Sequence, residues 1–156
     1  MRIFGIDPGM AIVGYSIVDI EKDGYKLISS GSIRTSKELS DGKRLAEIRE
    51  DIIFLLEKFV PDVASIEQLF FFKNLKTIIP VAEARGVIIE AISSKDIPIY
   101  EYTPLVVKQT LTGYGRATKN EVADMVMISL NQKSIPKLDD TVDSIAIAIC
   151  HARNSI

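Results

Sequence analysis

Three strand-like runs within the first 33 residues restrict the possible folds more than any other feature of the sequence. Residues 2–7, 11–20 and 24–33 are rich in β-branched and aromatic side chains, and only the short turns PGM and EKDG separate them. Consecutive strands that are joined by such tight turns pair in an antiparallel manner. The chain is therefore expected to begin with a three-stranded antiparallel meander.

Helical and strand-like segments alternate after this meander. Apolar residues recur at helical spacing between Ser40 and Pro61, and the run VASIEQ that follows is typical of a buried strand. Residues 74–93 are expected to form a helix that leads to the strand IPIYEY, and a helix between two strands indicates a parallel crossover. Further helices are expected over residues 104–112, 119–131 and 139–153.

This order of elements predicts an α/β fold with a mixed five-stranded sheet. Three antiparallel strands would be followed by two parallel ones, with helices on the flanks, which is the order found in ribonuclease H. No repeat or interdomain linker divides the chain, so residues 1–156 are expected to form a single domain. The fold by itself assigns no chemistry.

The composition excludes several classes of protein. The single Cys150 and the single His151 leave no disulfide framework and no cysteine-based zinc site, and they argue against histidine-based chemistry. No stretch approaches the roughly 20 apolar residues that span a bilayer, so a cytoplasmic protein without membrane contact is expected. The 19 basic and 21 acidic residues argue against a general DNA-coating protein, although the middle of the chain is locally positive.

Two apolar strand-like runs end in a carboxylate. Asp7 closes RIFGID and Glu67 closes VASIE. A buried, unpaired charge costs several kcal/mol, roughly, so Asp7 is expected to meet a positive partner. Asp140 and Asp143 are three residues apart on one side of the last helix, whose apolar run IAIAIC should pack on the sheet. Four carboxylates could then converge.

A divalent cation is the partner that such a cluster favours. Converging carboxylates repel one another, and hard ions such as Mg²⁺ or Mn²⁺ prefer oxygen ligands. Two ions roughly 4 Å apart can activate water, hold a phosphate and stabilise a leaving 3′ oxygen, which suggests phosphodiester hydrolysis. Each acid also has a structural explanation: turn formation for Asp7 and a surface strand end for Glu67. Helix capping explains Asp139, Asp140 and Asp143 individually.

The sequence resembles the RuvC-type Holliday-junction resolvases, bacterial crossover junction endodeoxyribonucleases with a ribonuclease H-like fold. Five segments carry the resemblance over nearly the whole chain: GIDPG, IEQLFF, EARG, YTPLVVKQTLTGYGRATK and DDTVDSIAIAICH. The resemblance implies a homodimeric endonuclease whose catalytic acids bind divalent metal. Together with the carboxylate chemistry above, it leads us to expect Mg²⁺, with Mn²⁺ as a substitute and two ions in each active site. It further implies paired nicks in four-way junction DNA, in recombination and repair, with RuvA and RuvB as branch-migration partners.

The resemblance also implies roles for individual residues. Four acids match the catalytic, metal-binding carboxylates of the family: Asp7, Glu67, Asp140 and Asp143. Lys108 and Lys119 match catalytic basic residues near the scissile phosphate, and Phe70 matches an aromatic wedge at the junction centre, although Phe71 and Phe72 are alternatives. The complete expected DNA-binding set is Phe70, Lys73, Lys76, Lys108, Arg116 and Lys119.

Several alternatives stay open at this point. The helix over residues 74–93 is apolar on several sides, which suits either a homodimer surface or an ordinary buried helix. The protein could be a ribonuclease H-like nuclease that acts on RNA or on RNA–DNA hybrids, or a non-catalytic junction-binding module whose acids only cap. GIDPG also resembles the phosphate loop of actin-like kinases, but the chain has about half their length and lacks a second glycine-rich motif.

Overall fold

The antiparallel meander forms as the sequence predicts. The computed structural model describes residues 1–69, 74–135 and 139–155. Its first three strands are β1 (Arg2–Asp7), β2 (Ile12–Glu21) and β3 (Gly24–Arg34). Both neighbouring pairs are antiparallel, and the register places Asp7 opposite Gly14 at the end of β1.

Two parallel strands complete the sheet on the other side of β1. They are β4 (Val63–Glu67) and β5 (Ile99–Tyr102), and the strand order is β3-β2-β1-β4-β5. This order confirms the predicted α/β fold with a mixed five-stranded sheet. Because β1 and β4 are parallel neighbours, their carboxyl ends meet at the same edge of the sheet.

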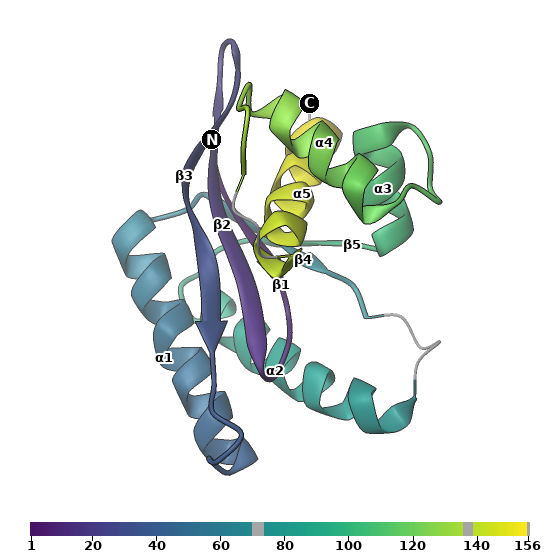
Figure 1. Cartoon of the computed structure of the whole chain (residues 1–156). Coiled ribbons are helices and arrows are strands. Elements are labelled where there is room, and N and C mark those ends of the chain that lie inside the picture. Colours follow the sequence, from purple (N-terminus) through teal and green to yellow (C-terminus); the bar gives the residue numbers. More distant parts are fainter. Residues whose placement is uncertain (70–73, 136–138, 156) are drawn as a thin grey trace.

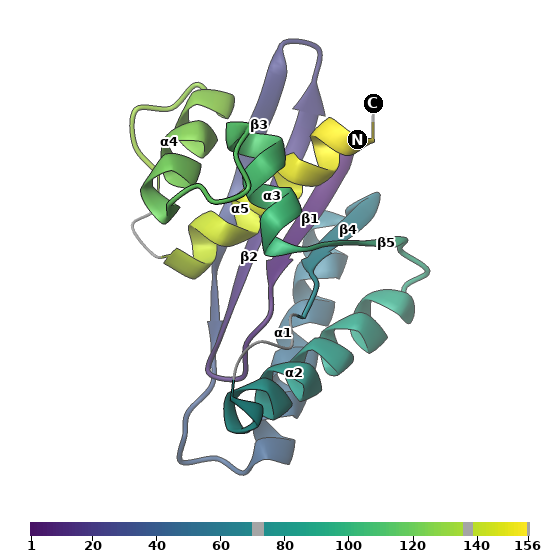
Figure 2. The same cartoon turned by 90° about the vertical axis from the view of Figure 1, so that its right-hand side faces the viewer.

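Helices cover both faces of the sheet (Figure 1, Figure 2). One face carries α1 (Asp41–Phe59) and α2 (Leu75–Ser93). The opposite face carries α3 (Pro104–Thr112), α4 (Lys119–Ser129) and α5 (Asp139–Asn154). The hydroxyl groups of Ser40, Thr103 and Thr118 accept backbone N–H groups at the starts of α1, α3 and α4, which explains where these helices begin.

Alternation along β1 separates the two cores. Phe4 and Ile6 pack with α1 and α2, whereas Ile3 packs with α5 on the other face. Asp7 has the same parity as Ile3 and therefore belongs to the α5 face. Between Arg2 and Asp7 the strand is apolar, and its one carboxylate lies on the face covered by the helix that carries Asp140 and Asp143.

Helix α5 is a core element. It packs against β1 and β2, and ten of its sixteen residues are buried. Cys150 and His151 are both among the buried residues, and the His151 Nδ1 lies 2.8 Å from the Tyr102 hydroxyl oxygen. Within the part of the chain that the structure describes, no helix combines the length and the apolar character that crossing a membrane requires.

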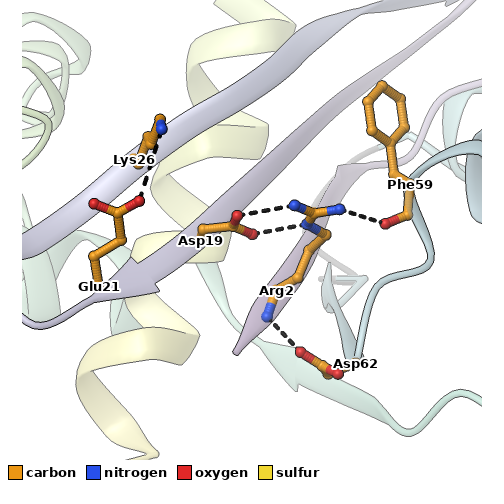
Figure 3. A network of polar contacts seen from close by, with 6 residues as sticks. All are labelled: Arg2, Asp19, Glu21, Lys26, Phe59 and Asp62. Carbon is orange, nitrogen blue, oxygen red and sulfur yellow. Dashed lines mark hydrogen bonds and ion pairs between the residues drawn. The ribbon is translucent and has the colours of Figure 1, made fainter.

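Arg2 ties the start of β1 to its neighbours (Figure 3). Its Nε and Nη2 donate to the two carboxylate oxygens of Asp19 at 2.8 and 2.9 Å, and its Nη1 donates to the Phe59 carbonyl oxygen at 2.8 Å. The backbone N–H of Arg2 donates to Asp62 Oδ2 at 2.6 Å. Hydrogen bonding between the two side chains raises the pKa of Arg2 and lowers the pKa of Asp19. This network holds β2 and the end of α1 against β1.

Replacing Arg2 by Met should lower the free energy of unfolding by about 1 kcal/mol, because a bidentate ion pair and a hydrogen bond to the backbone are lost together. Chemical denaturation would measure the change. Lys22, which is exposed at the turn between β2 and β3, offers a matched control: Lys22→Met should leave the unfolding midpoint unchanged. Equal stability of the two variants would contradict a role of the Arg2 network in stability.

Candidate active site

The adjoining ends of β1 and β4 place Asp7 and Glu67 side by side. Ile6 is in register with Ile66, so the next residue of each strand leaves the sheet at the same edge. A hydrogen bond links the Asp7 and Glu67 side chains. Both residues line a cavity of about 350 Å³, whose other walls are Pro8, Gln68, Leu69, Thr77, Ile78, Val81 and Pro104.

The first turn of α5 brings Asp140 and Asp143 to this edge. The backbone of Asp140 lies on Gly14, the residue that pairs with Asp7 across β1 and β2. Asp143 follows three residues later on the same side of the helix. The side chains of Asp140 and Asp143 are both half-buried. Segments that are more than 130 residues apart in the chain thus meet at one end of the sheet.

Burial and the negative charges of the other three acids act together on Asp7. Burial, and then the charges of Glu67, Asp143 and Asp140, raise the pKa of Asp7 to about 8. Burial also raises the pKa of Asp143, where the charge of Lys119 acts in the opposite direction. Burial and an excess of nearby negative charge thus disfavour the ionised form of Asp7 when no cation is bound. A bound divalent cation would neutralise this negative charge.

The donor set suits a hard cation, although the side chains do not form a closed ligand group. Among residues 1–69, 74–135 and 139–155, no three His, Cys, Asp or Glu side chains are arranged so that they could hold a metal ion. Mutual repulsion favours such separation of carboxylates. Oxygen donors without nearby thiolates match Mg²⁺ or Mn²⁺ better than Zn²⁺. The acids therefore fit a divalent cation by charge and by donor type, and their role as ligands stays a prediction.

Two lysines border the acids. Lys119 is the first residue of α4, and its Nζ lies 3.7 Å from Asp139 Oδ2 and 3.9 Å from Asp143 Oδ2. Lys108 on α3 also acts on Asp143, because its positive charge lowers the pKa of that carboxyl group. The Lys119 side chain is 68% exposed, so an anion at the site can reach it.

The remaining candidates for DNA contact are more scattered. Lys76 is exposed in the first turn of α2, next to Thr77 and Ile78, which line the cavity. Arg116 is exposed in the connection between α3 and α4. Phe70 and Lys73 lie outside the described residues, as do Phe71 and Phe72.

Arg85 on α2 supports the strand end that carries Glu67. Its Nε donates to the Glu67 carbonyl oxygen at 3.3 Å, and its Nη2 forms an ion pair with Glu101 Oε1 on β5 at 2.9 Å. That pair lacks the alignment of a hydrogen bond. Arg85 thus joins α2, β4 and β5 directly behind the site. Sequence pattern alone assigns it no role, because an arginine on a helix is ordinarily a solvated charge.

Sequence comparisons identify related proteins over nearly the full chain. Residues 3–151 match the family model described as crossover junction endodeoxyribonuclease RuvC. The protein of that name from Halothermothrix orenii is 48% identical over 154 residues, which cover 99% of this chain and 93% of the relative. The one from Thermosipho melanesiensis is 50% identical over 154 residues and covers 97% of each chain.

Solved structures show the same architecture. The structure of RuvC from Thermus thermophilus superposes with a TM-score of 0.92 at 32% sequence identity, covering 99% of this chain and 95% of that one. The complex of T. thermophilus RuvC with its Holliday junction substrate gives a TM-score of 0.91 at 29% identity over the same shares of the two chains. The fold is therefore that of RuvC, a ribonuclease H-like fold.

Proposed function

Because this chain belongs to the RuvC family of crossover junction endodeoxyribonucleases, we propose that it resolves Holliday junctions by symmetric paired nicks in DNA recombination and repair. The T. thermophilus relative, which has the same fold, is a protein solved with a Holliday junction substrate. The four acids at the shared edge of β1, β4 and α5 supply the chemistry, through hydrolysis of a phosphodiester bond.

The observation that carries the catalytic part of the proposal is the state of Asp7. Burial and three further carboxylates raise its pKa to about 8 in a site beside an open cavity. An arrangement that serves only to cap α5 would need no acid on β1 or β4. We assign the metal-binding role to Asp7, Glu67, Asp140 and Asp143, with Mg²⁺ as the ion, Mn²⁺ as its substitute, and two ions in each site.

Divalent cations, when bound, supply Lewis acidity for the phosphate and lower the pKa of an attacking water. The carboxylates would supply the negative charge that such ions neutralise. Lys108 and Lys119 face the charge that develops on the phosphate oxygens, where fixed positive groups stabilise a transition state. Water attacks phosphorus and the bond to the 3′ oxygen breaks, so the products are a 5′-phosphate and a 3′-hydroxyl. Such ends can be religated.

A homodimer suits this function, because two symmetric nicks require two active sites. Helix α2 is the surface that we propose for the dimer. Ile79 on α2 is 54% exposed. Gly86 lies two helical turns further along α2, and a Cβ at this position would meet open space. A second copy packed here would cover this apolar surface. Within the proposed pathway, RuvA and RuvB would deliver the junction by branch migration.

Two other activities make different predictions about the substrate. A ribonuclease H-like enzyme for RNA would cut an RNA–DNA hybrid faster than a junction. A non-catalytic junction-binding module would bind the junction equally well with or without Mg²⁺ and would never nick it. Membership of the RuvC family favours the junction nuclease over both of these alternative activities.

A synthetic four-way junction should be nicked by the protein in Mg²⁺ and left intact in a chelator. A linear duplex of the same sequence and a matched RNA–DNA hybrid serve as control substrates, and both should be cut at least about tenfold more slowly, on the scale of ordinary substrate discrimination. Gel analysis of strands labelled at each end would measure the nicks and their symmetry. Tight junction binding with no Mg²⁺-dependent nicking would overturn the proposed function.

A further inference from the structure

The first turn of α5 rests directly on the backbone of β2, and Gly14 makes this approach possible. A methyl group at Gly14 would overlap the Asp140 carbonyl oxygen and would lie 3.1 Å from the Asp140 Cβ. The carbonyl belongs to the backbone, so no side-chain rotation can relieve the overlap. Gly14 is also paired with Asp7 across the sheet. It therefore contacts two segments that each carry an acid of the site.

The same close approach continues along α5 at Gly5 on β1. A methyl group there would overlap the Ser144 carbonyl oxygen and would lie 2.8 Å from the Ala148 Cβ. Gly5 and Gly14 thus set the height of α5 above the sheet over more than one helical turn. Of the two, only Gly14 lies under the turn that carries Asp140 and Asp143.

Thr141 controls the orientation of this turn. It lies between the two acids and is only 1% exposed. Its hydroxyl donates to the Gly31 carbonyl oxygen on β3 at 3.2 Å, and the Ser144 hydroxyl donates to the Thr141 carbonyl oxygen at 2.7 Å. A hydrogen bond from the buried side of a helical turn to a neighbouring strand fixes the rotation of that turn about the helix axis. The acids on its other side then point in a defined direction.

We propose that Gly14 and Thr141 are positioning residues, which set where Asp140 and Asp143 stand relative to Asp7 and so determine the metal affinity and turnover of the site. This inference rests on the proposed function. Metal ligands tolerate displacements of about 0.2 Å, whereas an overlap with the backbone at Gly14 requires the turn to move by several times that. Misplacing a reacting group by roughly 1 Å can cost about 10²-fold in rate.

A purely structural role for these residues predicts a different result. Loss of packing alone would lower the melting temperature, while the folded molecules would keep their metal affinity and their kcat. A positioning role predicts that metal affinity and kcat fall together in folded protein, with little change in KM for the junction. Binding of the ion to DNA-free protein separates the two roles without relying on cleavage.

The test compares two pairs of variants. Gly14→Ala is paired with Gly42→Ala, at an exposed position of α1 where a Cβ meets nothing within 4 Å. Thr141→Val, which removes the hydroxyl, is paired with Thr141→Ser, which keeps it. Calorimetric titration with Mn²⁺ gives the metal affinity of DNA-free protein. The melting temperature with and without Mg²⁺, and kcat and KM for a four-way junction, complete the measurements.

We expect Gly14→Ala to lower Mn²⁺ affinity by about 10- to 100-fold and kcat by about 10²-fold. Thr141→Val should lose about tenfold in affinity, Thr141→Ser should retain most of it, and Gly42→Ala should match the wild type. Unchanged Mn²⁺ affinity and kcat in folded Gly14→Ala would overturn the inference. If Gly14→Ala does not fold, equal Mn²⁺ affinity of the two Thr141 variants would overturn it instead. Wild-type protein that binds Mn²⁺ yet leaves junctions intact would refute the proposed function alone, since the affinities still decide the positioning role.

Discussion

Replacing Asp7 by Asn should reduce Mg²⁺-dependent nicking of a four-way junction by more than about 10³-fold, while junction binding is retained. Asp7 lies at the centre of the cluster, where Glu67, Asp143 and Asp140 all act on it. The substitution keeps the shape of the side chain and removes the charge that would hold a cation. Below pH 8 Asp7 of the metal-free protein is largely protonated, so the substitution changes little charge beside the DNA phosphates, and junction binding in a chelator should be unchanged.

Single-turnover cleavage and gel-shift binding, measured on the same preparations, would separate the two effects. Asp51→Asn on the exposed side of α1 is the matched control, because it makes the same chemical change away from the cluster. Its nicking rate should equal that of the wild type. Substantial nicking by Asp7→Asn, within about tenfold of wild type, would exclude Asp7 from the catalytic site that we propose.

The metal-free protein should become less stable as the pH rises from about 4 to about 8. The pKa of Asp7 in the folded protein, about 8, lies above its ordinary value of 3.8. Between these values the folded state binds a proton that the unfolded state has released, so the free energy of unfolding decreases with rising pH. Burial raises the pKa of Asp143 as well, and this acts in the same direction. Because each unit of pKa shift corresponds to about 1.4 kcal/mol, the total change should amount to several kcal/mol.

Chemical denaturation in the presence of a chelator, at several pH values between 5 and 8.5, would measure this decline. Asp7→Asn should remove most of the dependence and should be more stable than the wild type at pH 8. Mg²⁺ should restore the stability of the wild type at pH 8 and have little effect on Asp7→Asn. A wild-type curve that is flat, or as steep as that of Asp7→Asn, would contradict a raised pKa for Asp7.

The fold can be predicted from the sequence because the local patterns and the order of the elements along the chain agree. The predicted strands end at Asp7 and Glu67, and the predicted helix follows Ser40. These ends lie within one or two residues of the ends of the observed elements. Two parallel strands joined through a helix can pair in few ways, so the sheet followed from the order of elements. Element ends were the least accurate feature: the helix expected over residues 119–131 ends at Ser129.

Only part of the candidate site can be predicted from the sequence, for physical reasons. Carboxylates that end apolar strands stand out in a sequence, and the structure brings Asp7 and Glu67 together with the acids of α5. The contacts that orient these acids are different. The Thr141 hydroxyl bonds to a residue 110 positions away, and Arg85 reaches the Glu67 carbonyl, yet neither residue type is unusual where it occurs. Gly14 did carry a signal, since a glycine within a strand often marks a close approach of another backbone.

The acids of this site come from three elements that are far apart in the chain: β1, β4 and α5. Ribosomes make α5 after all five strands, so a nascent chain that has already formed its sheet still lacks two of the four carboxylates. Completing the site requires the first turn of α5 to reach the end of β1, and bringing such distant segments together costs chain entropy. With the catalytic roles that we propose for these acids, a growing or incompletely folded copy would lack a complete site and would be unable to nick DNA.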